Sequence, residues 1–149
     1  MQQRLGRVAG MVVLGRYADA LRASIDLACD LIVAGFDAPA VLDVAALYPD
    51  TTWRDAAQTV EDMLGYLGFA VPAHEDARWL VILRAFGFSD LPIAEFYSPF
   101  LRRLPAWDAQ SELERALMAL LDDLDHATEP PGKEAVVARM REVVREALG

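Results

Sequence analysis

The chain has 149 residues, of which 54% are hydrophobic, and this is enough apolar material to fill one core. The formal net charge is −9, from 14 basic and 23 acidic residues. This excess of acids argues against non-specific binding to nucleic acid, whose phosphates need Lys and Arg, but it permits binding of a basic partner. No uninterrupted apolar run approaches the roughly 18 residues that a membrane-spanning helix needs.

The cellular compartment is indicated by the single cysteine, Cys29, which excludes an intramolecular disulfide and favours a reducing environment. Because Cys29 lies within an apolar pattern, we expect it to be a buried small hydrophobe. Arg4 and Arg7 precede an apolar run that loosely resembles a secretory signal, but Arg16 stands just before the position where cleavage would occur. These features predict a cytoplasmic protein.

Apolar residues recur at helical spacing along nearly the whole chain, which predicts an all-α protein. Residues 8–14 are the only stretch where a strand competes with a helix. The next helix is expected to end at Gly35. Its predicted apolar stripe is Leu21, Ile25, Ala28 and Ile32.

Two further helices are predicted before residue 70. The first is short, from about 38 to 47, with Pro39 in its first turn. The second opens with Thr52 and Asp55, which resemble a capping box, and is expected to end at Gly68. Its predicted buried stripe is Ala56, Val60, Met63, Leu64 and Leu67.

The segment from about 76 to 105 combines helical spacing with turn residues. A helix over 76–86 is predicted to end at Gly87, with Trp79, Ile82, Leu83 and Phe86 facing inward. Ser89 or Asp90 is then expected to cap a new helix, with Pro92 in its first turn.

Pro99 is predicted to kink or break this new helix near Ser98, because proline removes a backbone donor and crowds the preceding turn. Phe96 and Phe100 recur at helical spacing and are expected to pack as a wedge that joins two sub-bundles.

A long helix follows two overlapping cap signals, Trp107-Asp108 and Ser111 to Glu114. The run Pro130-Pro131-Gly132 is predicted to be a loop. The apolar stripes of the helices on either side of it are Leu113, Leu117, Leu120, Leu121 and Leu124, then Val136, Val137, Met140, Val144 and Leu148.

The predicted architecture is one all-α domain, residues 1–149, formed as a bundle of seven or eight helices with two sub-bundles. The expected seam is 71–73, which separates the N-terminal helices, 1–72, from a second group, 73–149. Neither part is large enough for an independent core to be assumed.

The two histidines give the only hints of catalysis or metal binding. Asp122 and His126 stand four residues apart on one helical face, but two ligands do not complete a metal site. The acids beside His74 are explained by the dipole of the helix that follows. A glycine-rich phosphate loop, a GxSxG elbow, a CxxC pair and an HExxH helix are missing from the sequence. We therefore expect no enzyme, no cofactor and no metal.

Acidic and aromatic side chains of the C-terminal half form the candidate partner-binding surface. The carboxylates are either an ordinary solvated face or an anionic patch that complements a basic protein cleft. Tyr97, one position off the phenylalanine stripe, is expected to keep its hydroxyl at a wet edge. The candidate residues are Glu95, Tyr97, Glu112, Glu114, Asp122, Asp123 and Asp125.

Four elements follow one another over residues 78–148: an aromatic-anchored helix, a proline-tagged restart, a leucine-rich acidic helix and a closing amphipathic helix. Their sequences are RWLVILRAFGF, SDLPIAEFYSPF, SELERALMALLDDLDH and EAVVARMREVVREAL. This order, with Glu95-Phe96 and an anchor at Phe100, resembles the bacterial self-protective, colicin-D-type immunity proteins. Pro99 and the helices before residue 72 depart from the family's pattern.

The resemblance implies a small helical bundle that binds and inactivates a co-produced tRNA-cleaving toxin. Members of that family look like nucleic-acid mimics, which place acidic side chains where the toxin's basic cleft would hold tRNA phosphates. The acids on the matching helices of this chain are Glu95, Glu112, Glu114, Asp122, Asp123 and Asp125.

The expected function is therefore immunity-type inhibition of a basic, tRNase-like nuclease toxin by occlusion of its RNA-binding cleft, without binding to nucleic acid or membrane. The protein is expected to be a monomer or a homodimer. One alternative is a helical protein–protein interaction module without a toxin partner, in which the acids only keep the protein in solution. Another is an enzyme of an unfamiliar helical class that uses His74 or His126.

Overall fold

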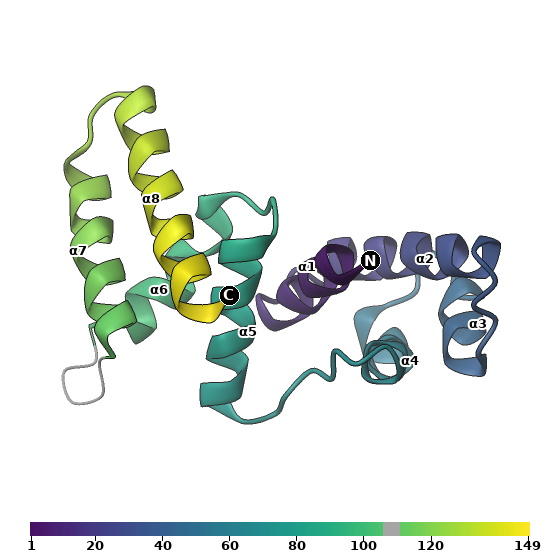
Figure 1. Cartoon of the computed structure of the whole chain (residues 1–149). Helices are drawn as coiled ribbons and strands as arrows, with labels where there is room; N and C mark the ends of the chain where they lie inside the picture. Colours follow the sequence, from purple (N-terminus) through teal and green to yellow (C-terminus); the bar gives the residue numbers. More distant parts are fainter. Residues whose placement is uncertain (106–110) are drawn as a thin grey trace. The chain divides into compact units, whose positions relative to one another are not determined.

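The computed structural model describes residues 1–105 and 111–149. This part of the chain contains eight α-helices and one short 3-10 helix, joined by loops. Figure 1 shows how the chain runs through them. There is no strand in this part, so the prediction of an all-α protein with seven or eight helices is confirmed. Among the same residues, none of the helices combines the length and apolar character required to cross a lipid bilayer.

The chain forms two compact units, Met1–Val81 and Ile82–Gly149, here called unit 1 and unit 2. The first four helices lie in unit 1: α1 (Gln2–Val13), α2 (Tyr17–Val33), α3 (Pro39–Ala45) and α4 (Trp53–Tyr66). Helix α5 (Glu75–Phe88) carries residues of both units. Unit 2 continues with the 3-10 helix η1 (Ile93–Glu95), α6 (Tyr97–Arg103), α7 (Glu112–His126) and α8 (Pro130–Leu148).

The boundary between the units lies inside α5, between Val81 and Ile82, and not at 71–73, where the sequence analysis placed the seam. Residues 71–73 lie in the loop between α4 and α5. A loop marks where helical hydrogen bonding stops, whereas side-chain packing decides which unit each turn of a helix joins.

Helix α1 settles the one ambiguous stretch of the sequence, because residues 8–13 are helical. Leu5, Val8 and Val12 are buried at intervals of three and four residues, which places them on one face. Gly15, at φ +77°, then adopts the left-handed conformation that allows the turn into α2.

The buried face of α2 differs slightly from the predicted stripe. Leu27 and Ala28 are buried, whereas Ile25 is only half-buried. Cys29 is exposed, which corrects the expectation of a buried cysteine. One residue further along a helix turns the side chain by about 100°, so Cys29 points away from the face that holds Ala28.

Helix α4 begins and ends as predicted: Thr52 is its N-cap, and Gly68, at φ +88°, follows its C-cap. The Thr52 hydroxyl donates to the Asp55 carboxylate at 3.0 Å, so these side chains pair with each other in place of the expected capping box. The predicted residues that are buried are Ala56, Val60, Met63 and Leu64.

Three phenylalanines form the centre of unit 2. The ring centroid of Phe86 lies 5.1 Å from those of Phe96 and Phe100, and both pairs meet edge to face. All three side chains are fully buried. Phe96 and Phe100 thus pack with Phe86 inside one unit, and the predicted wedge is part of a core.

Gly87 does not end α5, which continues to Phe88 and corrects the prediction for this residue. A Cβ atom built on Gly87 would lie 2.7 Å from Val144 Cγ1, so α5 and α8 approach each other more closely here than a larger residue allows. Ser89 donates to the Ala85 carbonyl at 2.5 Å. Ser89 therefore belongs to the end of α5 and does not cap the next helix.

Three prolines of unit 2 lie in the first turns of helices, although they were predicted to break a helix or to form a loop between helices. Pro99 lies in the first turn of α6, and the interruption falls at Phe96, between η1 and α6. Pro130 and Pro131 form the first turn of α8 and are not a loop. The first N–H groups of a helix have no intrahelical acceptor, so a proline there removes nothing.

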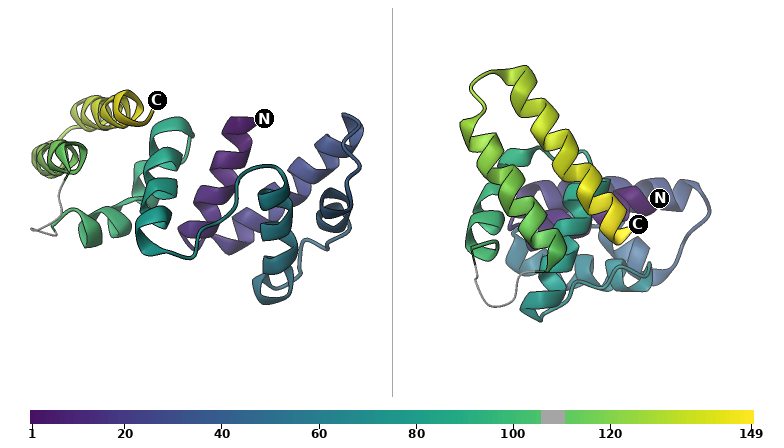
Figure 2. Two further views of the ribbon diagram at one scale, coloured as in Figure 1. Left: turned by 60° about the horizontal axis from the view of Figure 1, so that its bottom comes forward. Right: turned by 60° about the vertical axis from the view of Figure 1, so that its left-hand side comes forward.

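Helices α7 and α8 lie side by side and antiparallel, joined by a short loop (Figures 1 and 2). The predicted capping box of Ser111 and Glu114 is present at the start of α7. The other predicted cap, Trp107-Asp108, lies outside the described residues. The buried apolar residues of the two helices are Leu117, Leu121, Leu124, Met140 and Val144.

Candidate partner-binding site

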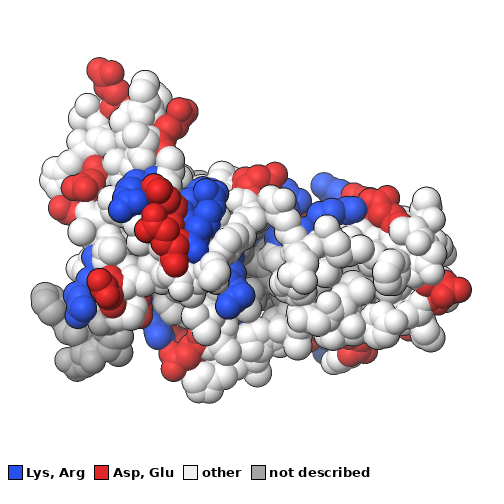
Figure 3. All heavy atoms as spheres, viewed as in Figure 1, with Lys and Arg blue, Asp and Glu red and all other residues white. Residues whose placement is uncertain are grey.

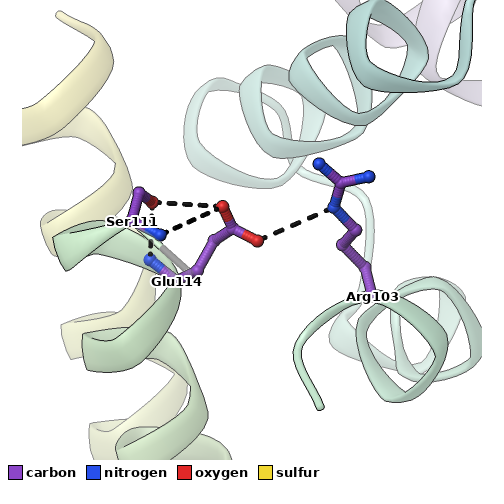
Figure 4. Close-up of polar contacts among 3 residues, drawn as sticks. All are labelled: Arg103, Ser111 and Glu114. Atoms are coloured by element: carbon purple, nitrogen blue, oxygen red, sulfur yellow. Dashed lines mark hydrogen bonds and ion pairs between the residues drawn. The ribbon is translucent and has the colours of Figure 1, made fainter. Parts of the chain in front are cut away.

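Glu114, one of the predicted partner-binding residues, is engaged inside unit 2 and is only 8% exposed (Figure 4). Its Oε1 accepts hydrogen bonds from the backbone N–H of Ser111 at 3.4 Å and from the Ser111 hydroxyl at 3.2 Å. Its Oε2 lies 3.7 Å from Arg103 Nε. The carboxylate thus closes the start of α7 and links it to α6, and Glu114 is not available to a partner.

Three other predicted residues lie apart from the acidic end of α7, which consists of Asp122, Asp123 and Asp125. Glu95 and Tyr97 flank the junction between η1 and α6, and both are half-buried. Glu112 is exposed in the first turn of α7, where the helix dipole favours a carboxylate. It precedes Asp122 by ten residues, which is about 15 Å along the helix.

The remaining predicted residues, Asp122, Asp123 and Asp125, are exposed together at the C-terminal end of α7. Figure 3 shows acidic side chains, in red, on the surface over α7. None of the three aspartates forms an ion pair with Lys or Arg among residues 1–105 and 111–149. The C-terminus of a helix is the negative end of its dipole, so carboxylates there are unfavourable. These acids therefore lie where they destabilise their own helix.

His126 is the basic residue in the last turn of α7. Its Nδ1 lies 2.8 Å from the backbone carbonyl of Asp122 and 3.7 Å from the Asp122 carboxylate. The hydrogen bond to this carbonyl raises the pKa of His126 above 6.5, and the negative charges of Asp122, Asp125 and Asp123 act in the same direction. When it is protonated, the imidazole therefore partly offsets the acids around it.

We expect the imidazole of His126 to titrate at higher pH in the folded protein than in the same chain unfolded in urea. The raised pKa means that its stabilising contribution is fully present below the unfolded value and is lost as the pH rises through the folded value. Two-dimensional NMR of the imidazole Cε1–H signals measures both values. Asp122→Asn is expected to reduce the difference without removing it, since the backbone carbonyl remains. A folded pKa at or below the unfolded one would contradict the assignment.

An open groove of about 490 Å³ lies between the C-terminal end of α6 and α7, within unit 2. Leu101, Leu104, Met118 and Leu121 supply much of its apolar surface. Its charged lining residues are Arg115, Asp122 and Asp125. The groove thus joins two of the predicted acids to an apolar surface.

Two large apolar side chains of the groove are exposed: Leu101 at 57% and Met118 at 39%. Neither residue is among the partner-binding residues predicted from the sequence. Met118 lies beside the leucine stripe of α7, and Leu101 lies between the phenylalanines and two arginines. The position of Met118 just outside a buried stripe is a signal that could have pointed to it, but single exposed apolar residues are common. Only the shared groove distinguishes Leu101 and Met118 from other such residues.

Among the residues that the structure describes, neither histidine takes part in a metal-binding cluster. Within the two described ranges there is no group of three or more His, Cys, Asp or Glu side chains that could hold a metal ion. His74 lies at the start of α5, where its Nδ1 accepts a hydrogen bond from the backbone N–H of Asp76 at 3.3 Å. This contact gives His74 a local role in beginning the helix.

The candidate site is thus the acidic end of α7 with the adjoining apolar groove, an arrangement that can bind a surface carrying both positive charge and apolar side chains. Comparisons of the chain with known protein families, curated proteins and solved structures found no match.

Proposed function

We propose that this protein is an immunity-type inhibitor that binds a basic, RNA-cleaving nuclease through the acidic end of α7 and covers the RNA-binding cleft of that nuclease. The supporting observation is the position of Asp122, Asp123 and Asp125, which are exposed together at the helix end where carboxylates are least favourable. Local conflicts of this kind are expected where a surface serves binding.

The chemistry of these carboxylates suits a cleft that normally holds phosphates. A carboxylate accepts two parallel hydrogen bonds from an arginine, as a phosphate does. The net charge of −9 would attract a basic nuclease over several ångströms and speed its association. We place this binding in the cytoplasm, a reducing compartment in which the exposed Cys29 stays a thiol.

The proposal predicts that a basic nuclease domain is encoded beside this gene, and it is tested with that domain. Stopped-flow fluorescence is expected to show an association rate that falls steeply as the salt concentration rises. Charge reversal of Asp122, Asp123 and Asp125 to lysine is expected to slow association by about tenfold or more and to restore RNA cleavage in a fluorogenic assay.

The matched control reverses three exposed acids of unit 1, Asp26, Asp43 and Asp50, and thus changes the net charge by the same amount. It is expected to affect association several-fold less. Equal effects of the two triple variants would exclude a specific role for α7. A neighbouring nuclease that forms no complex would overturn the proposal.

A trade-off between stability and binding is also expected at this helix end. Asp125→Asn is expected to raise the free energy of unfolding by about 0.3–1 kcal/mol, because it removes a negative charge from the C-terminus of α7. The same change is expected to weaken the complex. Urea unfolding and binding measurements on one preparation check both effects. Glu112→Gln is the control: it removes a negative charge from the N-terminal end of α7, where the helix dipole favours one, and is expected to lower stability. Destabilisation by Asp125→Asn would contradict the dipole argument.

A further inference from the structure

One face of α7 turns toward the groove. Met118, Asp122 and Asp125 all line it, and their spacing of four and three residues places them in one row along the helix. Asp123 has the same charge and is exposed, but it lies on a different face and does not line the groove. The groove therefore offers an apolar position at Met118 and, one turn later, a pair of carboxylates.

The form of the groove suits part of another protein better than an enclosed small molecule. It is open to solvent, and the exposed side chains of Leu101 and Met118 form part of its apolar surface. The cationic lining residue, Arg115, precedes Asp122 by seven residues, about 10 Å along α7. Arg115 therefore lies at the other end of the groove and does not neutralise the two carboxylates.

We propose that this groove receives a basic amphipathic helix of the partner, with one apolar side chain over Met118 and one Lys or Arg side chain at Asp122 and Asp125. Charge complementarity identifies this occupant, because its positive group would meet two carboxylates that have no Lys or Arg partner within the described residues. Helices commonly bind apolar grooves through residues one turn apart. This inference rests on the proposed function and specifies which segment of the nuclease makes the contact.

The first test uses a synthetic helical peptide of about 15 residues in which Leu and Arg stand at positions i and i+4. The comparison peptide has the same composition, with Arg on the face opposite to Leu. Titration into the full-length protein with ¹³C-methyl-labelled methionine is expected to shift the Met118 signal only with the first peptide. The signals of the buried Met63 and Met140 serve as internal references.

Substitutions then distinguish binding in the groove from a general effect of the protein's negative charge. Met118→Ala is expected to raise the dissociation constant about 3- to 10-fold, and Asp122→Asn and Asp125→Asn about threefold each. Asp123→Asn is expected to change it less than twofold. Leu80→Ala, which truncates a similarly exposed side chain in unit 1, is expected to have no effect.

Three results would overturn the groove proposal: an effect of Asp123→Asn equal to that of Asp125→Asn, an unshifted Met118 signal, or a Met118 signal that shifts with protein concentration alone. The third would identify a second copy of the chain as the occupant. In the nuclease assay, a complex that is insensitive to Met118→Ala rejects the groove and leaves the proposed function standing. The absence of any complex rejects the proposed function itself.

Discussion

The Arg141→Ala variant is expected to unfold with a free energy about 2–3 kcal/mol lower than that of the natural sequence. Arg141 extends from α8 to the end of α5, where it donates hydrogen bonds to the carbonyl oxygens of Phe86, Ser89 at 3.2 Å and Leu91 at 2.5 Å. The last carbonyls of a helix have no partner within the helix. Of the three acceptors, Phe86 is in the last turn of α5, and Ser89 and Leu91 follow the helix. Removing their charged donor costs about 1–3 kcal/mol for a group left without a partner in a buried setting.

Two further contacts join α8 to the end of α5, one from Arg141 and one from Arg145. The central carbon of the Arg141 guanidinium lies 4.5 Å from the ring centroid of Phe86, which adds a cation–π interaction. Arg145 donates from Nε to the Gly87 carbonyl at 2.5 Å, one turn further along α8. Burial lowers the pKa of Arg141, and the nearby charge of Arg145 acts in the same direction. The group nevertheless stays charged, since an arginine keeps its proton in proteins.

Arg139→Ala is the matched control, because Arg139 lies on the same helix but is exposed and pairs with Glu142 at 3.0 Å. Such surface pairs contribute about 0–1 kcal/mol, so only a small change is expected. Arg141→Met, which keeps much of the side-chain volume, separates lost hydrogen bonds from lost packing. Urea unfolding with hydrogen exchange resolved for α5 and α8 measures the effect within unit 2. Equal stability of the Arg139→Ala and Arg141→Ala variants would contradict the role assigned to Arg141.

The Gly87→Ala variant is expected to lose about 1–3 kcal/mol of unfolding free energy, although alanine is the better helix former. The new Cβ would lie 2.7 Å from Val144 Cγ1 and 3.3 Å from Val144 Cβ. Val144 is fully buried and β-branched, so it has little freedom to move aside. Overpacking at such a contact outweighs the gain in helix propensity, which is at most about 1 kcal/mol.

Gly65→Ala in α4 is the control, because a Cβ at Gly65 would meet nothing within 4 Å. It is expected to be neutral or to stabilise the protein by up to about 1 kcal/mol. In the double variant Gly87→Ala with Val144→Ala, the two losses are expected to be less than additive, since the second change removes the atom that clashes. Additive losses in urea unfolding would show that the contact between Gly87 and Val144 is not the cause.

Arg141→Ala and Gly87→Ala both act on the contact region between α5 and α8, which was not predicted from the sequence. Gly87 was predicted to end a helix, because glycine is common at helix ends. No special role was predicted for Arg141 or Arg145. Their partners lie 50 or more residues earlier in the chain, so no local pattern could reveal them.

The candidate site was predictable in part. The cluster of Asp122, Asp123 and Asp125 is visible in the sequence, and helical spacing places these residues near one end of a helix. Glu114 was wrongly included, because a carboxylate in a capping box and one on a free surface look alike in sequence. The apolar side of the site depends on Leu101 and Met118, which come from two helices and line one groove only after α6 and α7 have packed.

The sequence by itself determined that the chain is helical and where several helices begin or end, because periodicity, the Ser111–Glu114 capping box and the glycine stops at Gly35 and Gly68 act over a few residues. It also determined the net negative charge and the acidic end of α7. Only the tertiary structure decided where the units divide, which prolines begin helices, and which acids stay exposed. Those outcomes depend on contacts between residues far apart in the chain, and local preferences are compatible with more than one of them.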